Sequence, residues 1–140
     1  MPRLTFLSHF VLCLAIGASA WFAHANGVFA TVWANDQSMM TSAIGALFVG
    51  TTVYIGSLAW KPTPDTDASF GHLAERILPM LGLFGTAFGL SLQAKALSGG
   101  AAAFAPLATS LYCTACGVLA ALVVAVMTFN LERGIRRARR

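Results

Sequence analysis

The stretch at residues 98–131, SGGAAAFAPLATSLYCTACGVLAALVVAVMTFNL, decides the fold class, because it contains no Asp, Glu, Lys or Arg. A membrane-spanning helix needs about 20 mostly apolar residues, and this run exceeds that length. Two other uncharged runs, Phe6 to Ala23 and Gln37 to Trp60, are also long enough to cross a bilayer. None of the three shows the period-two alternation of a membrane β-barrel. The sequence therefore predicts membrane-spanning helices.

Composition supports this class over the whole chain. Of 140 residues, 57% are hydrophobic and only 10% are charged. A soluble core in so short a chain cannot hide that much apolar surface. We predict an all-α polytopic membrane protein with about four transmembrane helices in two antiparallel hairpins. The expected ranges are Phe6 to Ala23, Met39 to Trp60, Ile77 to Gln93 and Phe104 to Leu131.

These helices divide the chain into four regions. We expect an N-terminal transmembrane hairpin at 1–60, a short cytoplasmic loop at 61–76, a second transmembrane hairpin at 77–131 and a basic cytoplasmic tail at 132–140. His72, beside Glu75 and Arg76, is expected to be a solvated residue of the loop.

Basic residues predict the orientation, because Lys and Arg concentrate on the cytoplasmic side of membrane proteins. Placing both termini in the cytoplasm leaves Lys95 as the only Lys or Arg outside. We therefore expect a multi-pass protein of the cell inner membrane with both termini cytoplasmic. The basic cluster after the last helix is interpreted as a topology anchor attracted to the lipid bilayer, with no nucleic-acid partner. Its members are Arg133, Arg136, Arg137, Arg139 and Arg140.

The first helix has a competing interpretation. Arg3, an apolar run and small residues at Ala18-Ser19-Ala20 or Ala23-His24-Ala25 resemble a cleavable signal peptide. The apolar run is at the long end for such a peptide, and cleavage would leave an odd number of spans. We expect an uncleaved anchor.

The sequence shows no clear pattern of a metal site or a catalytic site. Cys113 and Cys116 have the spacing of a redox pair or half a metal site, but they lie in an apolar run without a second pair. Cysteine in such a run packs as a small hydrophobe. The 3 histidines are scattered among different segments. No nucleophile, base and acid converge, so we expect no enzyme, no cofactor and no metal.

Two predicted helices carry a stripe of small and hydroxylated residues. At about 100° per residue, one face of the third helix holds Gly82, Gly85, Thr86, Gly89 and Gln93. One face of the fourth holds Ser110, Thr114, Gly117, Ala121, Ala125 and Thr128. Such stripes allow close helix packing and interhelical hydrogen bonds, or they form the polar wall of an ion path. The pattern alone leaves both readings open.

Both stripes fall within longer motifs. The run Pro79 to Leu90, PMLGLFGTAFGL, closely resembles the Pro-x-x-Gly-Leu-Phe/Leu-Gly-Thr-Val-x-Gly segment of the MotA/TolQ/ExbB proton-channel family. The run Ala108 to Ala121, ATSLYCTACGVLAA, followed by Asn130, resembles that family's final helix. The order and spacing of the two motifs on successive helices make the pair specific.

The resemblance implies an ion (proton) channel subunit of a stator-like membrane motor complex. It implies a homo-oligomer, a pentamer in this family, around a short single-span partner of the MotB/TolR/ExbD type with an intramembrane Asp. Thr86 and Thr114 match the family's pore-lining threonines, and the hydroxyl stripe adds Ser110 to this ion pathway. Pro79 matches the proline that opens the family's helix. The expected packing positions are Pro79, Gly82, Gly85, Gly89, Gly117 and Ala121.

The chain also departs from the family pattern. The family's large cytoplasmic domain is reduced here to Lys61 to Arg76, and Thr109 occupies the position of an acidic residue found in ExbB-type transporters. The last three predicted helices hold no Asp, Glu or His away from their ends. A threonine hydroxyl does not titrate near neutral pH, so the proton carrier is expected on the partner or in a file of water. Whether the ion is a proton or sodium stays open.

Two other functions fit the sequence. One is a non-conducting structural scaffold, in which the small-residue stripes serve only packing. The other is a holin-like small pore former, which would not need two ordered threonine-glycine motifs.

Overall fold

The computed structural model describes residues 2–36, 38–60, 63, 65–99 and 105–139. Within these residues the chain is helical and contains no strand. The helices are α1 (Pro2–Ala25), α2 (Val28–Asn35), α3 (Met40–Trp60), α4 (Ser69–Ser98) and α5 (Ala105–Ala138). All but α2 are long enough and apolar enough to cross a membrane. The prediction of an all-α, multi-span membrane protein is confirmed.

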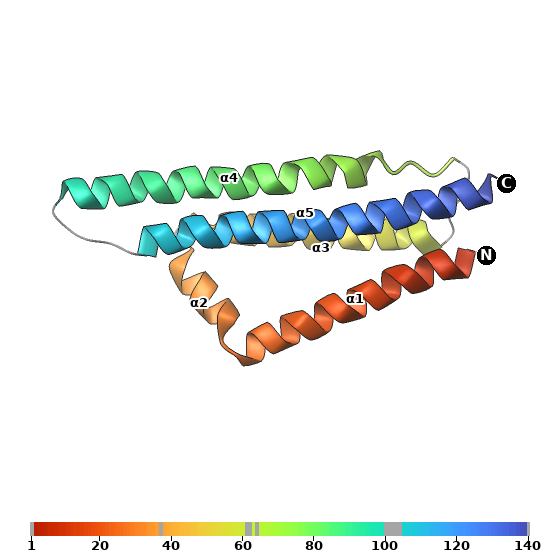
Figure 1. Ribbon diagram of the computed structural model, residues 1–140, viewed down its shortest axis with the longest axis horizontal. Helices are drawn as coiled ribbons and strands as arrows, with labels where there is room; N and C mark the ends of the chain where they lie inside the picture. Colours follow the sequence, from red (N-terminus) through yellow and green to blue (C-terminus); the bar gives the residue numbers. More distant parts are fainter. Residues whose placement is uncertain (1, 37, 61–62, 64, 100–104, 140) are drawn as a thin grey trace.

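Helices α3, α4 and α5 lie side by side, and α4 runs antiparallel to α5 along most of its length (Figure 1). Helix α1 meets α3 and α5 near its own beginning and diverges from them toward α2 (Figure 1). The start of α1 and the end of α5 lie at the same end of the bundle (Figure 1). The short α2 connects the end of α1 to the start of α3 at the other end of the bundle and contacts α5 (Figure 1).

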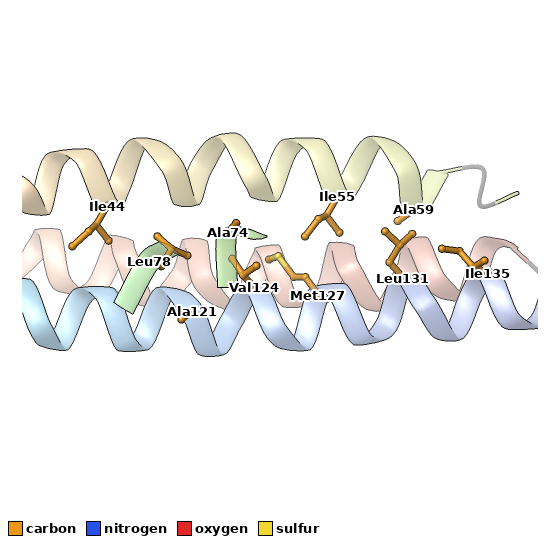
Figure 2. Close-up of a cluster of buried hydrophobic side chains, with 10 residues drawn as sticks. All are labelled: Ile44, Ile55, Ala59, Ala74, Leu78, Ala121, Val124, Met127, Leu131 and Ile135. Carbon is orange, nitrogen blue, oxygen red and sulfur yellow. The ribbon is translucent and has the colours of Figure 1, made fainter. Parts of the chain in front are cut away.

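The apolar core lies among α3, α4 and α5. Figure 2 shows side chains of α3 and α5 pointing toward one another, with Ala74 and Leu78 of α4 between them. The buried members are Ile44, Ile55, Ala59, Ala74, Leu78, Ala121, Val124, Met127, Leu131 and Ile135. Many other large apolar side chains remain exposed, including Trp21 and Leu83 at 73% and 67%. A bilayer or neighbouring subunits would cover such a surface.

Helix α4 begins at Ser69, earlier than the predicted start at Ile77. The reason is a local turn, in which the Ser69 backbone N–H and hydroxyl donate to the Asp67 carboxylate at 2.8 and 2.7 Å. These donors hold the pKa of Asp67 below its ordinary value. Pro79 consequently lies inside α4, so the expectation that this proline opens the helix is wrong.

Two further boundaries differ from the sequence prediction. The connection predicted before the second span contains α2, which is separated from α1 by Gly27 in a left-handed conformation, with φ 71°. At the other end, α5 continues to Ala138, so most of the predicted tail is helical. Arginines in the last turn favour this extension, because their positive charges interact favourably with the negative end of the helix dipole. Phe104, the predicted start of the last span, lies outside the described residues.

Candidate ion pathway at the contact of α4 with α5

Helices α4 and α5 approach each other through two glycines. A Cβ atom on Gly82 would lie 2.8 Å from the carbonyl oxygen of Cys113, and one on Gly117 would lie 2.7 Å from that of Leu78. Both distances are too short for any side chain, so the backbones themselves are in contact. Of the other predicted packing residues, Gly85, Gly89 and Ala121 are buried, whereas Pro79 is only partly buried.

The three predicted ion-pathway residues lie together one turn from this glycine contact. The hydroxyl groups of Thr86 and Thr114 are hydrogen-bonded to each other across the two helices. The Ser110 hydroxyl donates to the backbone oxygen of Thr86 at 3.1 Å. The backbone oxygen of Ser110 lies 3.1 Å from both threonine hydroxyls. We call Thr86, Ser110 and Thr114 the hydroxyl cluster.

The hydroxyl cluster has more acceptors than donors. The Thr86 hydroxyl also lies 3.0 Å from the carbonyl oxygen of Gly82, but a hydroxyl carries a single hydrogen and donates to one partner at a time. Ser110 is buried, Thr86 is partly buried and Thr114 is exposed on the surface of the isolated chain. The cluster therefore extends from Ser110, buried between the two helices, to Thr114 on their surface.

The start of α3 and the residues just before it contact α5 next to the hydroxyl cluster. Cys113, which is fully buried, places its sulfur 3.6 Å from the Ser38 hydroxyl and 3.5 Å from the Thr41 hydroxyl. Asp36 organises this segment, because its carboxylate accepts from the Ser38 hydroxyl at 2.8 Å and from the Thr41 backbone N–H at 3.0 Å. None of these residues was predicted from the sequence to belong to the site. Their signal was an Asp and a Ser immediately before a helix, which is a capping pattern.

Not all residues of the two stripes join the hydroxyl cluster. Thr128 lies near the other end of α5, where it packs against Gly71 of α4, and its hydroxyl has no partner among the described residues. The side-chain oxygen of Gln93 is also buried without a partner in the described part of the chain. The stripes thus continue as packing surfaces beyond the polar cluster.

A charged cluster links α4 to α5 far from the hydroxyl cluster. His72 places Nε2 2.8 Å from the Glu132 carboxylate and Nδ1 3.6 Å from that of Glu75. Arg136 approaches the same Glu132 at 4.0 Å. The expectation that His72 is a loop residue is wrong, because His72 belongs to α4. This link was not predicted, because the apolar pattern places the start of the helix at Ile77, after His72.

The predicted anchor arginines occupy the end of α5. Arg133, Arg136, Arg137 and Arg139 are exposed there, while Arg140 lies outside the described residues. Within the described ranges, no group of three or more His, Cys, Asp or Glu side chains is placed to hold a metal ion.

Comparison with known families agrees with the two motifs and extends the match beyond them. No curated protein and no solved structure matches the chain. The sequence model of one family matches residues 62–139, which contain both α4 and α5 and more than half of the chain. The chain therefore belongs to the MotA/TolQ/ExbB proton channel family.

Proposed function

We propose that this chain forms the wall of an ion (proton) channel in a stator-like membrane complex, in which a partner helix brings the proton carrier. The observation that carries the proposal is the hydroxyl cluster. It is built by backbone contact of two helices and is presented outward at Thr114.

The surroundings of Thr114 support this assignment. The neighbouring turns of α5 on the same face carry Leu111 and Val118, which are 65% and 46% exposed. On α4, Thr86 lies between the exposed Leu83 and Leu90. The exposed residues one turn to either side of both threonines are therefore apolar. A polar group on an opposing helix would therefore find a hydroxyl partner at the level of Thr114, between these apolar neighbours.

The proton carrier in this proposal comes from outside the chain. Threonine and serine hydroxyls orient and relay protons but do not carry charge near neutral pH. An intramembrane carboxylate costs about 2.5–3.5 kcal/mol by insertion scales, so it needs polar neighbours. We therefore assign the carrier to an intramembrane Asp on a short single-span partner of the MotB/TolR/ExbD kind, surrounded by a homo-oligomer of this chain. The family suggests a pentamer, with the ion gradient coupled to motion or force.

The proposed location is the cell inner membrane with both termini in the cytoplasm. The start of α1 and the end of α5 share one end of the bundle, where the anchor arginines also lie (Figure 1). Lys and Arg favour the cytoplasmic side.

The test is proton flux through the reconstituted complex. Thr114→Val removes the exposed hydroxyl with little change in shape, and flux should fall about fivefold, because a hydrogen bond contributes about 1 kcal/mol. Thr114→Ser keeps the hydroxyl and should retain flux. Thr52→Val is the matched control, because its hydroxyl donates only to Phe48 of its own helix, at 2.8 Å. Equal flux in Thr114→Val and Thr52→Val would contradict the proposal.

A non-conducting scaffold is the second candidate, and one observation favours it. The hydroxyls of Thr86 and Thr114 already have partners within the helix pair, as expected for interhelical hydrogen bonds that only stabilise packing. In that case Thr86→Val and Thr114→Val would weaken assembly without changing an ion current. A small pore former would instead conduct protons with no partner present, a result that would remove the need for a carboxylate from outside.

A further inference from the structure

The end of α5 separates its charges onto two faces. Glu132 contacts Arg136, one turn away on the same helix, and His72 of α4. Arg133 and Arg137 lie one turn apart on another face, where they line a pocket together with residues of α1. Among the described residues, neither Arg133 nor Arg137 has an acidic partner. Two positive charges are thus left uncompensated at one place.

The pocket lies between α1 and α5 and has a volume of about 130 Å³. Its lining residues are Thr5, Ser8, Asn130, Arg133, Gly134 and Arg137. Gly134 brings α1 close, because a Cβ atom there would lie 2.6 Å from the Thr5 hydroxyl oxygen. All six residues are polar or glycine, and none is acidic. Its size is below the range of about 300–1,000 Å³ for pockets that take a whole cofactor or drug-sized molecule.

We propose that this pocket binds a phosphate group and that the group belongs to the headgroup of an anionic phospholipid. Two guanidinium groups offer forked donors that match phosphate oxygens, and the Asn130 amide adds N–H donors on the same wall. The Ser8 hydroxyl donates its single hydrogen to the Thr5 carbonyl oxygen at 2.8 Å, so it does not donate to a phosphate. The specificity of the pocket therefore rests on Arg133, Arg137 and Asn130.

Its position assigns the phosphate to a lipid. Thr5 is the first residue of the first apolar span, and Arg133 and Arg137 lie in the last turns of the fourth. Headgroup phosphates occupy the same level, just outside the hydrocarbon. Basic pockets between membrane helices are known to hold anionic headgroups. The site is separate from the hydroxyl cluster and does not depend on the proposed ion pathway.

The test measures lipid retention by native mass spectrometry of the purified full chain titrated with phosphatidylglycerol. Each arginine near the membrane surface contributes about a fivefold gain in binding to anionic lipid. Arg133→Gln and Arg137→Gln should each lower phosphatidylglycerol binding about fivefold. Arg136→Gln is the matched control, with the same charge change in the same helical turn but outside the pocket. It should change binding less than twofold, because the Arg136 charge already faces Glu132.

Loss of a basic residue also weakens the orientation signal, so a charge-conserving pair guards against misinsertion. Arg133→Lys keeps the charge and loses the planar fork, and should still weaken binding several-fold, whereas Arg136→Lys should not. Phosphatidylcholine should bind poorly, and millimolar inorganic phosphate should not displace phosphatidylglycerol. Equal losses for substitutions at 133 and 136 would show non-specific attraction and overturn the site. Displacement by inorganic phosphate would overturn its assignment to a lipid.

Discussion

Substitution of Gly117 by Ala tests whether backbone contact between α4 and α5 holds the candidate site together. The new Cβ would lie 2.7 Å from the Leu78 carbonyl oxygen and 3.1 Å from the Gly82 Cα. Ordinary contacts begin at 3.4 Å, so the helices must separate by about 0.7 Å. Backbone atoms flank the new methyl group, and no flexible side chain can move aside. Overpacking of this kind costs about 1–3 kcal/mol.

The same separation should open the hydroxyl cluster. The bond from the Ser110 hydroxyl to the Thr86 carbonyl oxygen is 3.1 Å long, and a rigid shift would lengthen it to about 3.8 Å, beyond hydrogen-bonding range. Gly117→Ala is therefore expected to lower both stability and proton flux. Stability is measured as the free energy of unfolding in mixed micelles, followed by far-ultraviolet circular dichroism.

Gly45→Ala provides the control for this prediction. Gly45 lies in α3, and its Cβ atom would meet nothing within 4 Å. Because Ala favours helix over Gly by about 1 kcal/mol, this variant should be neutral or slightly more stable. If Gly117→Ala unfolds with the same free energy as Gly45→Ala, Gly82 and Gly117 do not hold α4 and α5 in backbone contact.

Three other substitutions follow from the same contacts, each read out by the same unfolding measurement. Asp36→Ala removes the cap of α3 and should cost about 0.5–2 kcal/mol, whereas Asp65→Ala, in the exposed turn before α4, should cost nothing measurable. Thr128→Val replaces a buried hydroxyl that has no partner in the described residues and should stabilise the chain by about 1 kcal/mol; destabilisation would mean that the hydroxyl is bonded. A double-mutant cycle of His72→Ala with Glu132→Gln should give about 0.2–1 kcal/mol, because both side chains are at least one-third exposed; a larger coupling would indicate a drier contact.

The existence of the four spans could be predicted because uncharged runs of membrane length have few other stable structures. Their ends could not. The start of α4 depends on how Asp67 bonds Ser69, and the break before α2 depends on the left-handed conformation of Gly27. Both are local events in polar stretches, where apolar length carries no information.

The candidate site was predictable in part. Helical periodicity places Thr86 and Thr114 on the small-residue faces of their own helices, but periodicity says nothing of the register between two helices. The register comes from Gly82 and Gly117, each of which packs against the backbone of the facing helix. The support from Ser38 on Cys113 joins residues far apart in the chain through a turn, so no single-helix pattern contains it.

The proline inside α4 also marks a depth in the membrane. Pro79 has no backbone N–H, so the carbonyl oxygen of Glu75 cannot receive the bond that the helix would otherwise supply. In hydrocarbon, a carbonyl without a donor costs several kcal/mol, whereas in contact with water it costs little. We therefore expect the first turns of α4 to lie in the hydrated layer, together with the charged groups of His72 and Glu132. The boundary between the hydrated layer and the hydrocarbon is then expected near Pro79. Only the part of α4 beyond this residue would lie against lipid tails or a dry lumen.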